Sequence, residues 1–165
     1  MSTEEHRRNA PGSVRCVVLT ISDTRTPDND SSGDAIAGLL AANGHEIRLQ
    51  TIVKDDPAAV QHAIRSNLAA AQVVITTGGT GITSRDSTYE AISQLLEKRI
   101  DGFGELFRML SFEEIGSAAM LTRACAGTMG RTAVFSLPGA ENAVRLGMTR
   151  LILPEIGHVV RELNR

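Results

Sequence analysis

The feature that most constrains the fold is a repeated succession of short apolar runs and helical patterns. Residues 14–21 (VRCVVLTI), 73–76 (VVIT) and 132–137 (TAVFSL) are rich in apolar and β-branched residues. Such runs are typical of strands buried on both faces of a parallel sheet. A polar or glycine-rich loop and a helical pattern follow each run. This alternation predicts an α/β fold of three layers, α/β/α, with a mostly parallel central sheet.

The other elements are predicted from periodicity and from the signals at their ends. Ser31 or Ser32 is expected to cap a helix over 33–43, which Gly44 ends. Ser87 and Glu90 form a capping-box pattern. Pro154 is expected to interrupt or kink the last helical region. A half-exposed strand is predicted at 45–53, and helices are predicted to begin at Pro57 and at Ser87. The region 102–124 is predicted to form two helical pieces, broken near Ser111 or Gly116. Two further helices are predicted over 141–152 and 156–163.

Composition and charge exclude several classes of protein. The 165 residues predict a single domain over 13–165 after a flexible N-terminal tail over 1–12. A net charge of −2 and an aromatic content of 3% argue against a nucleic-acid partner. No apolar run reaches the roughly 20 residues that span a bilayer, and the N-terminus lacks the apolar segment of a signal peptide. We therefore expect a cytoplasmic protein without a membrane partner.

The residues that most often hold metals show no ligand spacing along the chain. Cys16 and Cys125 lie far apart in apolar surroundings, which predicts two reduced, buried thiols. The four histidines are also widely separated. The sequence therefore predicts neither a structural zinc site nor a redox motif.

Three polar loops follow the predicted parallel strands, at 22–32, 76–87 and 137–141. Ligands of such sheets bind at the carboxyl ends of the strands, so the loops are expected to converge on one cleft. The candidate residues that these loops bring to the cleft are Ser22, Asp23, Ser32, Gly33, Leu137, Pro138 and Gly139, together with the glycine turn described next.

The glycine turn Thr77-Gly78-Gly79-Thr80-Gly81 follows the strand at 73–76 directly. Glycines allow positive φ and leave room for a ligand, and successive backbone N–H groups can then point at one anion. Thr76, Thr77 and Thr80 offer hydroxyl donors. A tight turn without a ligand is the alternative. The turn lacks the Lys of a Walker A loop and the spacing of the dinucleotide fingerprint.

Two acidic positions are candidates for catalysis or metal binding. Asp86 follows the glycine turn, and a carboxylate beside a phosphate site suggests an intervening Mg²⁺. Asp55 or Asp56 is expected to cap the Pro57 helix, which leaves the other free for metal or proton transfer. Helix capping is the alternative for each of these residues. Arg85 is a candidate phosphate partner.

These motifs together resemble the MoaB/Mog family of molybdenum cofactor biosynthesis. The resemblance covers residues 14–158, with landmarks at 19–23, 30–33, 77–81 with Asp86, and 137–139. The stretch 102–116, GFGELFRMLSFEEIG, is especially similar to the MoaB branch. The resemblance implies a three-layer α/β/α domain that binds molybdopterin and assembles as a trimer or hexamer.

The resemblance also implies an activity, the transfer of AMP from Mg-ATP to the phosphate of molybdopterin. Asp55 and Asp86 match the family's catalytic aspartates and are the expected Mg²⁺ contacts. The glycine turn and Leu137-Pro138-Gly139 match ligand-binding loops, Ser22 and Asp23 match the first strand-end motif, and Glu105 is expected near the pocket.

One departure from the family pattern leaves the activity open. The Pro-Gly turn is often followed in the family by Ser, Pro or Thr and then Lys, whereas Ala140-Glu141-Asn142 stand here. Arg145, one helical turn later, is a candidate replacement for the lysine. The alternatives are a non-catalytic pterin- or nucleotide-binding member of the same pathway, and a flavin- or phosphate-binding module that leaves 102–116 unexplained.

Overall fold

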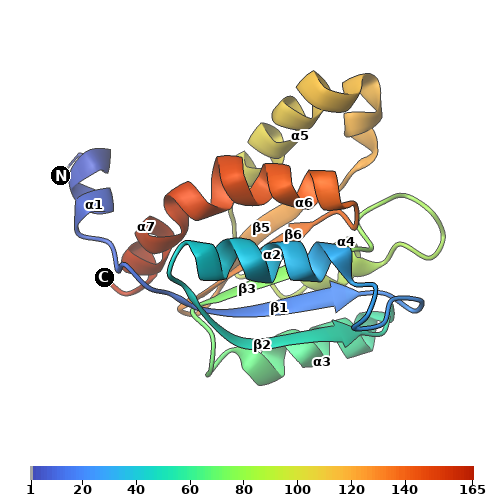
Figure 1. The fold of residues 1–165 in the computed structure, drawn as a ribbon, viewed down its shortest axis with the longest axis horizontal. Helices are drawn as coiled ribbons and strands as arrows, with labels where there is room; N and C mark the ends of the chain where they lie inside the picture. The colour runs from blue at the N-terminus through green and yellow to red at the C-terminus, as the bar shows by residue number, and fades with distance from the viewer. Residues whose placement is uncertain (1) are drawn as a thin grey trace.

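The fold is seen in a computed structural model, which describes residues 2–165. A single six-stranded sheet with the order β2-β1-β3-β6-β5-β4 lies between two layers of helices (Figure 1). The pairs β1–β2, β1–β3 and β3–β6 are parallel, whereas β4–β5 and β5–β6 are antiparallel. The predicted α/β/α class with a mostly parallel sheet is confirmed. The strands are β1 (Arg15–Ile21), β2 (Glu46–Val53), β3 (Val73–Thr77), β4 (Lys98–Arg99), β5 (Cys125–Met129) and β6 (Thr132–Leu137).

The helices divide between the two faces of the sheet. Alternate residues of β1 point to opposite sides, so that Cys16 and Val18 join one buried cluster and Val17 and Leu19 join the other. The first cluster packs under α2, α5, α6 and α7, and the second under α3 and α4. The helical elements are α1 (Thr3–Arg8), α2 (Ser31–Ala42), α3 (Pro57–Asn67), α4 (Thr88–Ser93), α5 (Asp101–Ile115), the 3₁₀ segment η1 (Gly116–Leu121), α6 (Glu141–Gly147), the π-helical segment η2 (Met148–Ile152) and α7 (Leu153–Leu163).

The helix ends agree with the predictions at some positions and differ at others. Asp56 caps α3 through the N–H of Ala59, as expected for one of the two aspartates. The cap of α2 is Asp30, whose Oδ1 accepts from the N–H of Gly33 at 3.0 Å, rather than Ser31 or Ser32. The capping box predicted at Ser87 and Glu90 does not form, because the Ser87 side chain makes no capping bond.

Two strands were not predicted, whereas one helical junction lies at the second of its two predicted positions. Strand β4 has only two residues, and β5 is a run of small residues without the β-branched pattern of a buried strand. The helical piece α5 ends at Gly116, where φ is +70°, so the break lies there and not at Ser111. The last helical region changes from the π-helical segment η2 to α7 at Leu153, next to Pro154, and helical structure continues through the proline.

The N-terminal residues also differ from the predicted flexible tail. Residues Thr3–Arg8 form α1, whose Ser2 and Glu5 make a reciprocal capping box. Helix α1 packs against α7 (Figure 1). None of the helices described between residues 2 and 165 has the length and apolar character needed to cross a membrane. Cys16 and Cys125 are free and buried as predicted, and burial raises the pKa of the Cys16 thiol to about 12.

Candidate functional site

The three strand-end loops converge on one cleft, as the sequence predicts. Its volume is about 400 Å³, and it lies at the carboxyl ends of β1, β3 and β6. Each of the three loops contributes residues to the wall. The lining residues are Thr20, Ile21, Ser22, Arg25, Asp30, Ser32, Thr77, Gly78, Gly139 and Ala140.

Two hydroxyl groups hold the loops of this cleft together. The Ser32 Oγ donates to the carbonyl of Gly139 at 2.6 Å, and the Thr77 Oγ1 donates to the carbonyl of Pro138 at 2.8 Å. The N–H of Gly78 donates to the carbonyl of Leu137 at 3.0 Å. The Pro-Gly loop is therefore fastened to both neighbouring loops. The hydroxyl protons of Ser32 and Thr77 are used for this, so Thr77 does not serve as the free hydroxyl donor expected from the sequence.

The glycine turn needs its glycines for positive φ, as the sequence suggests, and for close packing against neighbouring protein atoms. Gly78 and Gly79 have φ of +105° and +71°, values that L side chains rarely adopt. A Cβ at Gly78 would collide with the carbonyl of Ile21, and one at Gly79 with the hydroxyl of Thr88. A Cβ at Gly81 would lie 2.8 Å from Oδ2 of Asp86. The turn is thus closely packed on both sides.

Asp86 is held against the far end of the turn as an ionised carboxylate. Its Oδ2 accepts from the N–H of Thr83 at 2.9 Å and from the Thr83 hydroxyl at 2.6 Å. These bonds, the hydroxyl first, lower the pKa of Asp86, although partial burial opposes them. The carboxylate therefore carries its charge at neutral pH and is fixed in orientation.

Asp55 has the opposite electrostatic environment. Burial raises its pKa, and the negative charges of Asp23 and Asp86 raise it further. Its Oδ1 is buried without a hydrogen-bond partner. The backbone N–H of Asp55 donates to Oδ1 of Asp23 at 3.0 Å, so Asp23 fixes the loop that carries it. Two sequence candidates, Asp55 and Asp86, are thus brought within electrostatic reach of each other.

The surroundings of Asp55 fit a cation. The hydroxyl of Thr88 is also buried without a hydrogen-bond partner. The space that a Cβ of Gly79 would fill lies against this hydroxyl and 3.6 Å from Oδ1 of Asp55. A carboxylate oxygen and a hydroxyl oxygen, both unsatisfied, are ligands that Mg²⁺ accepts. Asp55, Thr88 and Asp86 form a donor set of hard oxygens at the glycine turn.

Arg123 was missed by the sequence analysis and is central to the site. Its backbone N–H donates to the carbonyl of Thr80, and its guanidinium donates to the carbonyls of Gly81 and Asp86. It also pairs with Glu90 and lies over the Tyr89 ring, 5.0 Å from the centroid. A lone Arg before a strand gives no sequence signal of this kind, because its partners lie about 40 residues earlier.

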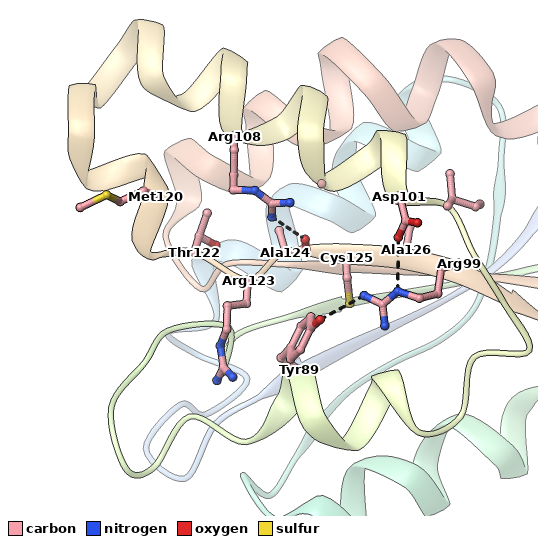
Figure 2. Close-up of a pocket in the computed structure, with 12 residues that line it drawn as sticks. Tyr89, Arg99, Asp101, Arg108, Met120, Thr122, Arg123, Ala124, Cys125 and Ala126 are labelled. Carbon is pink, nitrogen blue, oxygen red and sulfur yellow. Dashed lines mark hydrogen bonds and ion pairs between the residues drawn. The ribbon is translucent and has the colours of Figure 1, made fainter.

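A second cavity, of about 320 Å³, has Arg123 in its wall (Figure 2). Arg99, Arg108 and Arg123 line it together with the Tyr89 ring. The Arg99 guanidinium donates to the Tyr89 hydroxyl at 3.1 Å, and Arg108 donates to the carbonyl of Ala124 at 3.2 Å. We call this cavity the arginine pocket. Arg99 also pairs with Asp101 of the pocket wall at 3.3 Å, so the three guanidinium groups face two acidic partners, Asp101 and Glu90. The remaining positive charge suits an anionic ligand.

Other sequence candidates lie outside both cavities. Glu105 is exposed on α5 and lines neither the cleft nor the arginine pocket. Arg145 donates to the Glu141 carboxylate at 2.9 Å and lines a separate surface cavity, so it does not replace a lysine in the strand-end cleft. Arg85 is exposed. Leu137 is buried core, and Pro138 takes part through its carbonyl.

The fold and the strand-end cleft define an α/β protein of the kind that takes a small ligand at the carboxyl ends of its parallel strands. Comparison with known proteins gives the family. Residues 17–158 match the model described as "Probable molybdopterin binding domain". The chain belongs to this family and is a molybdenum cofactor biosynthesis protein.

Relatives along the whole chain agree. The chain is 54% identical to molybdenum cofactor biosynthesis protein B of Bacillus cereus, across 100% of this chain and 99% of that protein. A crystal structure of a molybdenum cofactor biosynthesis protein B, also 54% identical, superposes with a TM-score of 0.92 over 95% of this chain and 99% of that one. The tungsten cofactor synthesizing protein MoaB from Pyrococcus furiosus, 41% identical, gives a TM-score of 0.85 over 94% and 100%. The predicted resemblance is confirmed.

Proposed function

We propose that this protein binds molybdopterin and transfers AMP from Mg-ATP to its terminal phosphate. The observation that carries the proposal is the position of the glycine turn. Its first glycine, Gly78, lines the strand-end cleft, and its last, Gly81, is bonded to Arg123 of the arginine pocket. Asp55 and Asp86 lie against the turn between them. The turn that carries these two carboxylates therefore connects the two cavities, which supports a reaction between ligands bound in them.

The arginine pocket suits the pterin substrate. Molybdopterin carries a phosphate and a flat ring, and the pocket offers three guanidinium groups beside the Tyr89 ring. Bidentate guanidinium bonds are the usual means of holding a phosphate in proteins. The strand-end cleft is left for the nucleotide, whose phosphates would reach the backbone N–H groups of the glycine turn.

The reaction is a substitution at the α-phosphorus of ATP. An oxygen of the pterin phosphate forms a bond to that phosphorus while the bond to the pyrophosphate oxygen breaks, and pyrophosphate leaves. The N–H of Gly78 is already bonded to Leu137, so the N–H groups of Gly79 and Thr80 would bind the phosphate oxygens, without reorganisation. Arg123 keeps the turn in place. Asp55, Thr88 and Asp86 would hold Mg²⁺, which neutralises developing charge when bound.

A second function has one observation in its favour. Glu141 follows the Pro-Gly loop of the cleft and forms an ion pair with Arg145, so the residues that follow this loop add no free positive charge. A protein that binds the pterin without adenylylating it is the alternative, and the retained carboxylates argue against it.

The two functions are separated by one assay. The purified protein is incubated with molybdopterin and Mg-ATP, and pyrophosphate and adenylylated pterin are measured. Release of both in equal amounts supports the transferase. Pterin binding without pyrophosphate supports the second function, and no pterin binding contradicts both.

Matched variants assign the chemistry. Asp86→Asn is expected to lower turnover on the order of 10²-fold or more, as other losses of preorganised electrostatic groups do. Asp28→Asn is the control, because Asp28 is exposed on the loop beside the cleft and lines neither cavity. Normal turnover by Asp86→Asn would exclude Asp86 from the reaction.

A further inference from the structure

Two histidines that are 152 positions apart in the sequence meet where α1 packs on α7. The ring centroids of His6 and His158 are 5.3 Å apart and nearly perpendicular. Glu162 lies one turn after His158 on α7, and its Oε1 is 2.8 Å from Nδ1 of His6 and 4.0 Å from Nε2 of His158. The three potential ligand atoms all lie within 4.8 Å of one another.

We propose that His6, His158 and Glu162 bind a Zn²⁺ ion, with water as the fourth ligand, and that this ion fastens α1 to the body of the protein. Two imidazole nitrogens, one carboxylate oxygen and one open position make a donor set that zinc accepts. Zinc–ligand distances of about 2.0–2.1 Å in a tetrahedron place ligand atoms about 3.3 Å apart. The observed separations of 2.8 and 4.0 Å lie on either side of that value. Small side-chain rotations would therefore complete the site.

The surroundings of His158 also suit a metal ligand. Its Nδ1 lies 2.8 Å from Oε2 of Glu155, which leaves Nε2 directed toward Glu162. A carboxylate bonded to the second nitrogen of a ligating histidine fixes the ring and raises its basicity. Glu155 is in turn bonded to Arg7 of α1. The carboxylate is therefore fixed from both helices.

The remaining partners of Glu162 leave room for the ion. Arg165 donates to Oε2 at 3.0 Å, the oxygen that does not face the histidines, and makes a longer contact of 3.4 Å to Oε1. Arg161 donates to Oε1 at 3.3 Å, a long contact that a zinc ion at Oε1 would replace. The side chains of His6 and His158 are only 15% and 22% exposed. The imidazoles are thus oriented by their packing and remain reachable by water.

The connection between the helices explains what the ion would do. Helix α1 contributes no buried residue, so polar contacts hold much of it in place. The segment that follows α1 packs closely on Gly157 of α7, since a Cβ at Gly157 would lie 2.8 Å from the carbonyl of Pro11. A zinc ion would add bonds from both helices at this junction. The expected consequence is a more protected N-terminus in the presence of zinc.

The test uses the full chain freed of metal and titrated with Zn²⁺ against a chromophoric chelator. One ion per chain is expected. His6→Ala should weaken zinc binding at least about 100-fold, more than the 10- to 100-fold expected of a residue that only supports a ligand, such as Glu155→Gln. His6→Ala should fold normally because α1 buries nothing. His62→Ala, at an exposed histidine of α3, is the matched control and should bind as the unaltered protein does.

A second readout follows the helix itself. Trypsin cuts after Arg7 and Arg8, and mass spectrometry measures the loss of the N-terminal peptide. Zinc should slow this cleavage in the unaltered protein and in His62→Ala, and should not slow it in His6→Ala. Equal zinc affinity in His6→Ala and the unaltered protein would overturn the proposal. Equal cleavage rates with and without zinc in the unaltered protein would overturn it as well.

Discussion

The guanidinium of Arg123 donates two hydrogen bonds to the carbonyl oxygen of Gly81, from Nε at 3.0 Å and from Nη2 at 2.7 Å. A third bond from Nη2 reaches the carbonyl of Asp86 at 3.2 Å. One rigid, planar group therefore joins the end of the glycine turn to the residue that carries its carboxylate. A flexible ammonium group cannot make the same three contacts in one plane.

Arg123→Lys is therefore expected to loosen the turn while keeping the charge. Misplacing the phosphate-binding backbone by about 1 Å can lower turnover on the order of 10²-fold. Lost hydrogen bonds to a charged group should also lower the free energy of unfolding by about 1.5–3 kcal/mol. Adenylylation kinetics and urea unfolding measure the two effects. Arg131→Lys, in the exposed turn between β5 and β6, is the control and should change neither.

Gly79→Ala tests the need for a glycine in the turn. The residue has φ of +71°, and its Cβ would collide with the hydroxyl of Thr88. We expect a loss of about 1–3 kcal/mol in the free energy of unfolding, together with loss of nucleotide binding measured by calorimetry. Gly102→Ala is the matched control, since a Cβ there meets no atom within 4 Å and lies on helix α5. That variant should be about 0.4–1 kcal/mol more stable.

The parts of this site that were predicted from the sequence are those defined by short-range patterns. Gly78 and Gly79 are recognisable because consecutive glycines after a buried strand imply positive φ. Asp86 is a candidate because it follows the glycine turn, whereas local spacing leaves Asp55 and Asp56 open and only the family resemblance selects Asp55. Asp56 was recognised as a cap because Pro57 follows it.

The residues that were missed depend on contacts between distant segments. Arg123 gains its role from Gly81 and Glu90, which only the folded chain brings to it. The histidine pair at α1 and α7 has the same origin. Glu105 lines neither cavity, although the neighbouring Gly104 lines the arginine pocket, so its expected place near a pocket stays a prediction. Contacts between distant segments cannot be read from local spacing.

Asp55→Asn should make the protein more stable at neutral pH. Burial, then Asp23 and Asp86, raise the pKa of Asp55 in the folded state. A raised pKa means that the folded protein favours the protonated form. The stabilisation that protonated Asp55 gives to the folded state is therefore complete below the ordinary Asp pKa of about 3.9. It is lost as the pH rises through the pKa that Asp55 has in the folded protein. Asn keeps a neutral side chain at every pH, so the variant avoids this loss.

The measurement is thermal unfolding of both proteins across the pH range. The variant should have a slightly higher midpoint at pH 7.5, and the difference should disappear near pH 3.5, where both side chains are neutral. Asp28→Asn should match the unaltered protein at every pH, because Asp28 is exposed. A lower midpoint for Asp55→Asn at pH 7.5 would show that the charged form is stabilised instead.

Thr83→Ala tests the hydroxyl that fixes Asp86. Its bond to Oδ2 is the largest cause of the lowered pKa of Asp86, so its removal should raise that pKa. Adenylylation requires the charged carboxylate in our proposal, and the acid limb of the activity profile should then move to higher pH. Turnover at pH 8 should fall less than about tenfold, because the backbone bond from Thr83 remains. Thr26→Ala, on an exposed loop, should leave the profile unchanged. If the acid limb of the Thr83→Ala profile stayed at its original pH, the titration of a group other than Asp86 would determine that limb.

The apolar face of α5 and η1 predicts self-association. Met109, Phe112 and Met120 are 53%, 61% and 77% exposed, and Leu106, Ile115 and Leu121 are also exposed on these elements. Figure 1 shows α5 projecting beyond α6 at the top of the molecule. A contiguous apolar surface of this kind marks an interface more often than a solvated face. Because the family resemblance implies a trimer or hexamer, we expect this face to contact a second copy of the chain.

Light scattering should give a multiple of 17.6 kDa for the unaltered protein and a smaller mass for Phe112→Glu, while Leu49→Ser on the edge strand β2 keeps the original mass. A monomeric unaltered protein would contradict the prediction.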